Sequence, residues 1–143
     1  MNAIDDPPSA CARAVDERRR ALGRRGEQLA AAHLRRTGYE EIARNVRTRR
    51  GEIDLIVRDE RALVFVEVKT RTIGDAQRTP RPDQQPLAGL GTGQRARLRR
   101  LAAAWLAEER SRPFAASIRF DAVGVVLDAS GRLRGIEHLE NAW

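Results

Sequence analysis

Several kinds of residue are scarce in this 143-residue sequence, and each shortage excludes a class of protein. Its single cysteine, Cys11, allows neither an intrachain disulfide nor a cysteine metal cluster. The six aromatic residues are too few to support a surface that stacks successive bases, as single-strand binders do. No apolar run reaches about 18 residues and the N-terminus has no apolar signal core, so we expect a cytoplasmic protein without a membrane-embedded segment.

Lysine is the scarcest charged residue, because Lys69 is the only lysine among 27 basic residues. Such a bias toward arginine is typical of a GC-rich genome, in which arginine replaces lysine wherever only charge matters. A position that keeps lysine is then one that needs a compact ammonium group rather than a planar guanidinium. Chance survival of one lysine is the alternative explanation.

Positive charge is what the sequence has in excess. Its net charge is +7 and its sequence pI is near 11.1, which favours polyanionic partners through non-specific attraction. An acidic membrane surface would satisfy the same charge. We expect nucleic acid, DNA in particular, rather than a membrane as the partner, and leave a homodimer open. The length predicts one domain with a modest core.

Two apolar runs rich in β-branched residues, 53–57 and 63–68, flank a charged segment and predict a β-hairpin. If the turn centres on Glu60-Arg61, residues directly opposite each other share a face. One face then carries only apolar side chains, at Ile53, Leu55, Val57, Val64, Val66 and Val68. The other face carries apolar residues near the turn and two opposed charged pairs at the open end: Asp54 with Glu67, and Glu52 with Lys69. A slip of one residue would mix charged and apolar side chains on both faces.

This charged end has the chemistry of a cation site. Two carboxylates with Cβ atoms roughly 5 Å apart repel each other unless a cation lies between them. Oxygen ligands of this kind suit Mg²⁺ or Mn²⁺ rather than zinc. The ammonium of Lys69 can orient a water molecule and offset developing negative charge, which suits hydrolysis of a phosphodiester. The alternative is a surface hairpin whose charges only solvate one edge.

Six short motifs carry a resemblance to a known family: Gly26-Glu27, Gly38-Tyr39, RNVR at 44–47, GEIDLI at 51–56, FVEVKTR at 65–71 and RFDAV at 119–123. From about residue 22 to residue 126 the chain resembles the YraN family of uncharacterised bacterial proteins. That family is similar to the restriction-endonuclease-like PD-(D/E)XK nucleases, including Holliday-junction resolvases. The resemblance implies an α/β three-layer sandwich, in which a mixed central sheet is flanked by helices.

The resemblance also implies roles for individual residues. It makes Asp54 and Glu67 metal ligands, Lys69 the catalytic lysine, and Glu27 the helical acid that completes the site. Glu52, at the same end of the hairpin, is an auxiliary candidate. Related resolvases have Gln or Lys near the scissile phosphate at the start of the second helix. The YraN-like pattern usually has Lys there, and this chain has Gln94.

Helices and strands surround the hairpin in the predicted order α-β-β-β-α-β, with an additional edge strand. Residues 1–17 combine prolines, acidic and small residues, and are predicted to be a disordered tail before a single domain at 18–143. The predicted elements outside the hairpin are a helix at 18–37, a strand at 39–48, a flexible loop at 71–93, a helix at 94–109, a strand at 117–127 and an edge strand at 133–139.

Arginines flank the predicted site. Four of them are expected to contact a phosphate backbone, because they lie beside the charged end of the hairpin: Arg47, Arg49, Arg50 and Arg71. The arginines of the first helix form either a solvated face or a continuation of that surface. Arg119 and Asp121 share a face of their strand, and we expect a structural ion pair between them.

These patterns predict a metal-dependent nuclease that hydrolyses phosphodiester bonds, with structured or branched DNA as the expected substrate. The alternative is a catalytically silent nucleic-acid-binding or scaffold protein that keeps the nuclease fold. A silent descendant would tend to lose Asp54, Glu67 or Lys69. This chain has all three, which favours the enzyme.

Overall fold

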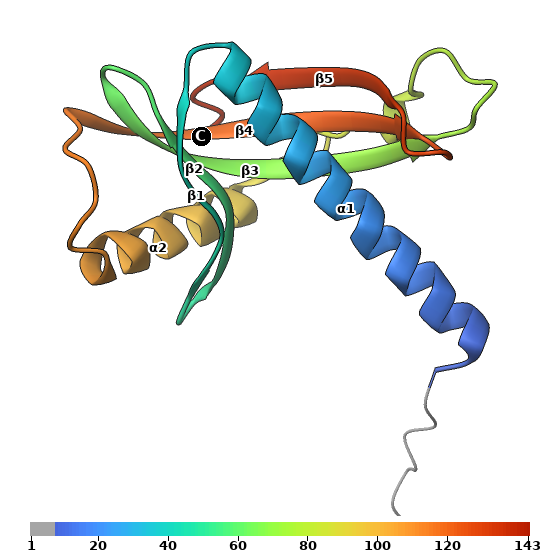
Figure 1. Cartoon of the computed structure of the whole chain (residues 1–143), viewed down its shortest axis with the longest axis horizontal. Helices are drawn as coiled ribbons and strands as arrows, with labels where there is room; N and C mark the ends of the chain where they lie inside the picture. The colour runs from blue at the N-terminus through green and yellow to red at the C-terminus, as the bar shows by residue number, and fades with distance from the viewer. Residues whose placement is uncertain (1–7) are drawn as a thin grey trace, which may run out of the picture.

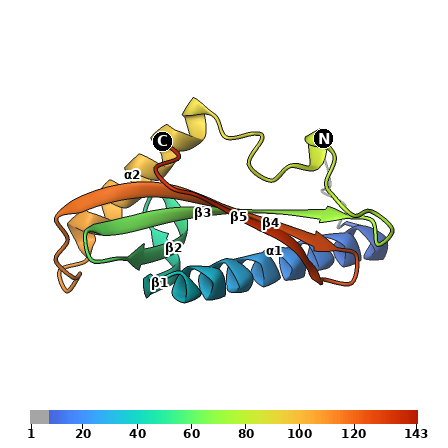
Figure 2. The ribbon, with the colours of Figure 1, turned by 90° about the horizontal axis from the view of Figure 1, so that it is seen from above.

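A mixed sheet with one helix on each face forms the body of the molecule (Figures 1 and 2). The computed structural model describes residues 8–143. Its elements are α1 (Ala10–Arg36), β1 (Glu40–Thr48), β2 (Gly51–Arg58), β3 (Ala62–Ile73), the short 3-10 helix η1 (Pro82–Gln84), α2 (Thr92–Glu108), β4 (Ser117–Asp128) and β5 (Leu133–Leu139). This is the predicted α/β class and the predicted order, with β5 as the additional edge strand.

The five strands lie in chain order across the sheet, β1-β2-β3-β4-β5. All neighbouring strands are antiparallel except β3 and β4, which are parallel along their whole length, from Ala62 opposite Ser117 to Ile73 opposite Asp128. Parallel neighbours need a crossover connection. Here α2 provides it, and it lies on the face of the sheet opposite to α1 (Figure 2). The three-layer arrangement follows from this crossover.

Each face of the sheet is covered by its own apolar cluster. On the α1 side, Ala30, Ala31 and Leu34 pack against side chains of β2, β3 and β4 that include Leu55, Val57, Val64, Val66, Val123, Val125 and Leu127. On the α2 side, Leu98, Leu101, Ala102 and Trp105 pack against Ile53, Ile56, Leu63 and Phe65. The alternation of side chains along β3 assigns its residues to the two layers.

The first helix begins earlier than the sequence predicts. Ser9 caps α1 by accepting a hydrogen bond from the amide of Ala12, at 3.2 Å. The prediction of a disordered tail is therefore wrong for residues 10–17, which are helical, and residues 1–7 lie outside the described residues. No helix within residues 8–143 is long and apolar enough to cross a membrane.

The connection between β3 and α2 is shorter than predicted. β3 continues to Ile73 and α2 begins at Thr92, so the irregular chain covers residues 74–91 rather than 71–93. This connection packs on the α2 side of the sheet, where Pro86 and Leu87 lie over Gly124 so closely that a Cβ there would meet both at 3.0 Å. Mobility of the connection stays a prediction.

Candidate active site at a fork in the sheet

The β2–β3 hairpin opens into a fork. The two strands pair in the predicted register from Arg58 opposite Leu63 to Leu55 opposite Val66, where the ladder stops. β2 continues to pair with β1 as far as Gly51, while β3 continues beside β4. The predicted opposed pairs Asp54–Glu67 and Glu52–Lys69 are therefore not ladder pairs, and Glu52 lies opposite Arg47 of β1 instead.

Asn45 marks the bend that opens the fork. Its φ is +50°, in the left-handed region that Asn enters more readily than most residues. On either side of it, Ala43 and Val46 both pack on the α2 cluster, although residues three apart on a regular strand face opposite ways. Ile53, opposite Val46, joins the same cluster. The prediction that Ile53 shares the face of Leu55 is therefore wrong, because the bend resets the alternation.

Asp54 points into the fork. The backbone amide of Val68 donates a hydrogen bond of 2.8 Å to Asp54 Oδ2, which replaces the ladder partner that β3 loses when β2 diverges. Burial, and after it the charge of Glu67, raise the pKa of Asp54 from 3.8 to about 7, although the hydrogen bond from the Val68 amide acts in the opposite direction. The charges of Glu27 and Glu52 act in the same direction as Glu67. Among the described residues, no basic side chain forms an ion pair with Asp54, so its ionised form lacks a compensating charge.

Glu67 and Lys69 lie together on the α2 side of β3. Glu67 is buried, with 8% of its surface exposed. Lys69 Nζ lies 3.1 Å from Glu67 Oε1, and Nη1 of Arg97, from α2, lies 3.8 Å from the same oxygen. Arg97 was not predicted from the sequence. Its position in the sequence could have indicated a place near the site, because Arg97 lies one helical turn after Gln94, on the same side of α2.

Glu27 reaches the fork from α1. The preceding residue, Gly26, lies against Thr70 of β3 so closely that a Cβ would be 1.9 Å from Thr70 Oγ1. This close approach half-buries Glu27, and burial raises the pKa of its carboxyl. In the amide orientation that satisfies both ends of Asn45, its nitrogen donates to Glu27 Oε2 at 2.8 Å and to Glu52 Oε1 at 3.2 Å. Asn45 therefore holds the two glutamates on either side of the bend.

Gln94 is the remaining predicted site residue. It lies in the first turn of α2, four residues before the buried Leu98. Its Oε1 atom is buried and has no hydrogen-bond partner within residues 8–143. A buried carbonyl oxygen without a donor is costly, so this atom is a ready acceptor for a water molecule or a ligand.

The donor set of the fork fits a hard divalent cation with an incomplete protein shell. Among residues 8–143, no group of three or more His, Cys, Asp or Glu side chains is arranged to hold a metal ion. Mg²⁺ is nevertheless commonly bound by only one or two carboxylates, with water and phosphate oxygens completing its shell. Asp54 and Glu67 supply such a pair, and the raised pKa of Asp54 indicates that a cation there would be favourable.

The four predicted phosphate-contacting arginines fall into two groups. Arg47, Arg49 and Arg50 are exposed at the β1–β2 turn, which packs against α2, and Arg49 forms an ion pair of 3.5 Å with Glu108. Arg71 is exposed on β3 and lines a hollow with α1 instead. The structure therefore does not gather all four around one point.

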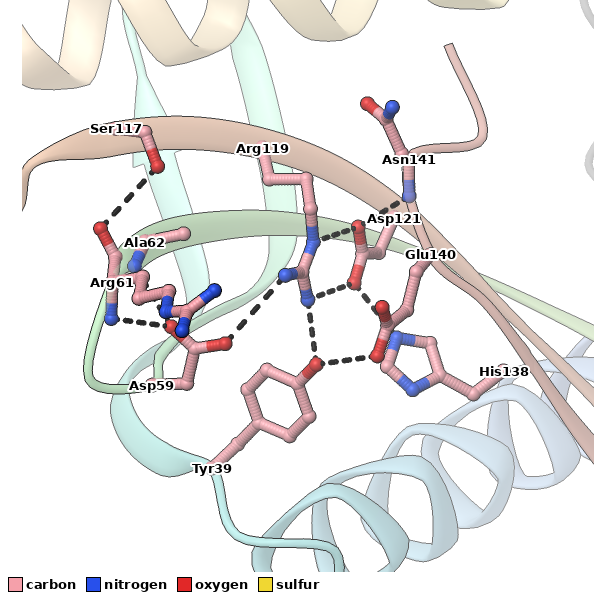
Figure 3. A network of polar contacts seen from close by, with 10 residues as sticks. All are labelled: Tyr39, Asp59, Arg61, Ala62, Ser117, Arg119, Asp121, His138, Glu140 and Asn141. Atoms are coloured by element: carbon pink, nitrogen blue, oxygen red, sulfur yellow. Dashed lines mark hydrogen bonds and ion pairs between the residues drawn. The ribbon is translucent and has the colours of Figure 1, made fainter.

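A second cluster of charged side chains is fully partnered (Figure 3). Arg119 donates two hydrogen bonds to the carboxylate of Asp121, at 2.8 and 2.9 Å, and a third to the Tyr39 hydroxyl, at 2.6 Å. His138 Nε2 lies 2.7 Å from Asp121 Oδ2. Burial alone would raise the pKa of Asp121, but its hydrogen bonds from His138 and Arg119 lower it. Asp121 has no exposed surface, which agrees with the predicted structural ion pair.

The part of this chain that is similar to known proteins includes all the residues of the fork. The model of the uncharacterised protein family UPF0102 matches residues 26–125. A UPF0102 protein of Frankia casuarinae is 45% identical over 124 residues, which is 86% of this chain and 96% of the relative. One of Geobacter metallireducens is 37% identical over 124 residues, and one of Streptomyces griseus is 46% identical over 113 residues. These matches cover 87% and 79% of this chain and 93% and 88% of the two relatives.

Proposed function

The chain belongs to the uncharacterised protein family UPF0102, the YraN family, and we propose that it is a divalent-metal-dependent nuclease that cleaves a phosphodiester bond at the fork between β2 and β3. One observation carries the proposal. Asp54 is held in the fork with its pKa raised to about 7, beside the buried Glu67, whose carboxylate lies 3.1 Å from the only lysine in the chain. Paired acids with perturbed pKa values and a neighbouring cation are typical of catalytic sites.

Each residue of the fork has a role in this proposal. Asp54 and Glu67 would hold Mg²⁺ or Mn²⁺, which supplies Lewis acidity and a more acidic water molecule when bound. Lys69 orients the attacking water and offsets negative charge that develops on the phosphate. Gln94 accepts a hydrogen bond from water at its free Oε1 atom. Glu27, held by Asn45, is the third acid at the edge of the site.

DNA is the proposed substrate, and structured or branched DNA in particular. The high net positive charge supports a polyanionic substrate. The preference for structured DNA rests on the resemblance to resolvases, whose motifs in this chain include GEIDLI and FVEVKTR. With few aromatic side chains, recognition would depend on backbone charge and shape.

A catalytically silent nucleic-acid-binding protein is the second candidate. One observation favours it: within residues 8–143 the acids of the fork do not form a ready group of three metal ligands. In that case Lys69 and Arg97 would serve only to neutralise the buried Glu67.

A cleavage panel separates the two candidates. Linear, single-stranded, flapped and four-way DNA are incubated with Mg²⁺ or Mn²⁺ and the wild-type protein. We expect metal-dependent cleavage of at least one substrate and a loss of roughly 100-fold or more in D54N and in K69R, since one well-placed electrostatic group has about this effect. K69R keeps the positive charge but not the compact ammonium, so its DNA binding should persist.

The matched control is D83N, at an exposed aspartate in η1, which should cleave like the wild type. Folding of each variant is checked by circular dichroism. DNA binding without cleavage of any substrate in the panel would support the silent protein instead. Full cleavage by folded K69R would remove Lys69 from the proposed chemistry.

A further inference from the structure

A basic hollow lies between α1 and β3, outside the fork. It has a volume of about 280 Å³ and is lined by Arg19, Leu22, Gly23, Thr70, Arg71 and Thr72. We propose that this hollow is a binding subsite for a backbone phosphate of nucleic acid, one that flanks the phosphate bound at the fork. The choice of nucleic acid as the polyanion rests on the proposed function, but the subsite itself does not require cleavage.

The lining has the chemistry that a phosphate diester needs. Two arginines and two threonines are among the residues that line the hollow, and none of the described residues that line it carries a carboxylate. Arginine binds phosphate oxygens through two parallel N–H donors, and a threonine hydroxyl can donate an O–H hydrogen bond to the same oxygens. Gly23 leaves the hollow open, because a Cβ at this position would have no atom within 4 Å.

The two arginines of the hollow have free donors, unlike their neighbours on α1. Arg18 donates to the backbone carbonyl of Ala129, and Arg25 donates to that of Gly131 at 3.3 Å, so both are committed to the β4–β5 turn. Within residues 8–143, the side chains of Arg19 and Arg71 take part in no hydrogen bond or ion pair that the structure shows. Unpaired guanidinium groups beside a concave surface are available to an anion.

The position of the hollow links it to the fork. Arg19, Gly23 and Glu27 follow one another at four-residue intervals, so they lie along one side of α1, roughly 6 Å apart. On β3, Thr70 and Thr72 follow Lys69 along the stretch that β2 no longer covers. The hollow therefore lies one helical turn beyond the fork, along the stretch of β3 that β2 leaves uncovered. A nucleic-acid backbone that enters the fork would pass over it.

The test measures binding of a fluorescein-labelled DNA duplex of about 30 base pairs by anisotropy, in EDTA so that no cleavage occurs. Salt is varied between about 50 and 250 mM for the wild type and for R19Q/R71Q. Each neutralised phosphate contributes about −0.9 to the log–log slope, so loss of the one phosphate bound in the hollow should make the slope of the double variant shallower by about 0.9. Its affinity at low salt should fall roughly tenfold or more.

Two further variants make the result specific. R36Q/R110Q removes the same charge at exposed positions near the C-terminal ends of α1 and α2, outside the lining of the hollow, and should change the slope little. G23E introduces a carboxylate into the open space above Gly23 without a clash, and should weaken DNA binding while the helix stays intact. Anionic phospholipid vesicles of phosphatidylserine and phosphatidylcholine are tested in parallel as a competing polyanion.

Each outcome decides the proposal. An unchanged slope in R19Q/R71Q, equal losses in R36Q/R110Q, or no DNA binding by the wild type at the lowest salt would overturn the subsite. Vesicle binding that depends on Arg19 and Arg71, with DNA binding that does not, would overturn it as well. If R19Q/R71Q shows the expected slope change but the wild type cleaves none of the DNA panel, the proposed nuclease activity is overturned and the subsite is retained.

Discussion

Asp54 is placed where an ionised carboxylate is unfavourable without a cation. Its side chain accepts one hydrogen bond, from the Val68 amide, and otherwise meets burial and the charge of Glu67. A structural role would be better served by a neutral residue of the same shape. In the proposed function, Asp54 lowers the stability of the metal-free fold and in return provides a ligand for a cation, and such a cost in stability is common at functional sites.

This trade predicts a pH-dependent stability difference between the wild type and D54N. Below about pH 4 the Asp54 carboxyl is protonated in both the folded and unfolded chain, so it has no effect. Between about pH 4 and 7 it ionises in the unfolded chain first, because its folded pKa is raised to about 7, and the wild type loses stability as pH rises. D54N cannot ionise, and should be more stable than the wild type at about pH 8 by about 2–4 kcal/mol.

Urea denaturation in EDTA at about pH 4, 6 and 8 measures this difference. Subtracting the free energy of unfolding of D54N from that of the wild type removes the contributions of other carboxyls, such as Asp59 and Asp121, whose pKa values are lowered. Added Mn²⁺ should stabilise the wild type and not D54N, because a ligand that binds only the folded state shifts the equilibrium toward it. A stability difference that does not vary with pH would contradict the assignment of the raised pKa to Asp54.

The sequence was sufficient to select Asp54, Glu67 and Lys69 as candidates, because charged residues inside β-branched runs conflict with strand propensity and stand out. It was not sufficient to find how they meet. The fork depends on the left-handed backbone of Asn45, and strand alternation alone assigns Ile53 to the wrong face. Arg97 was missed because its approach to Glu67 depends on where α2 crosses the sheet.

At the scale of elements, the contact between α1 and β3 sets the position of Glu27. Gly26 is the point of closest approach, and its missing side chain lets Thr70 pack directly on the helix backbone. Helix periodicity in the sequence predicted α1 but could not indicate which of its glycines lies at a contact. Gly23, one turn earlier, has open space around it.

Substitution of these two glycines by alanine should change the stability of the protein in opposite directions. G23A removes a flexible residue from a helix and should stabilise the protein by up to about 1 kcal/mol. G26A places a methyl group 1.9 Å from Thr70 Oγ1, and rotation of the β-branched threonine only exchanges this oxygen for its methyl group. Overpacking of this kind costs about 1–3 kcal/mol, which exceeds the gain in helix propensity.

Thermal denaturation of both variants and of G26A/T70A tests the contact. The double variant lacks the clashing oxygen and should regain part of the stability that G26A loses. DNA cleavage, if present in the wild type, should fall in G26A and not in G23A, because only the former displaces Glu27 from the fork. Equal stability of the two single variants would mean that α1 does not approach β3 at Gly26.

At the scale of the whole molecule, the buried polar network joins parts of the chain that are distant in sequence (Figure 3). Asp121 of β4 accepts hydrogen bonds from Arg119, from His138 of β5 and from the backbone amide of Asn141, at 2.9 Å for the last. Tyr39, in the connection between α1 and β1, donates to Glu140 at 2.9 Å. The network therefore fastens the C-terminal segment and the end of α1 to the sheet. The fork lies outside this set of contacts.

We expect D121N to destabilise the protein by about 3–5 kcal/mol, since removing one partner leaves the largely buried charge of Arg119 without its carboxylate. Chemical denaturation measures the loss, with D83N as the exposed control. The fraction of D121N that remains folded should bind Mn²⁺ as the wild type does. Loss of Mn²⁺ binding by folded D121N would assign this network to the site rather than to the scaffold.

The overall architecture was accessible from the sequence because hydrophobic periodicity and the order of elements leave few ways to cover both faces of a sheet. The boundaries were less accessible. α1 begins at Ala10 because Ser9 caps it, and β3 reaches Ile73 because β4 pairs with it throughout, which no local pattern in 71–73 indicates. Long-range pairing, rather than local preference, decided these ends.

The fork also has a consequence for self-association. Among the described residues, no strand lies beside one edge of β3 from Glu67 to Ile73, and an exposed strand edge is where a second chain adds to a sheet. The Val68 amide already donates a hydrogen bond to Asp54, and Thr70 packs against α1. The other residues along this edge include the charged Lys69 and Arg71. These residues keep other strands away while leaving the backbone open to a soluble ligand. Replacing them with apolar residues would expose an apolar strand edge at which other chains could add, so in the proposed function the same few positions serve both solubility and chemistry.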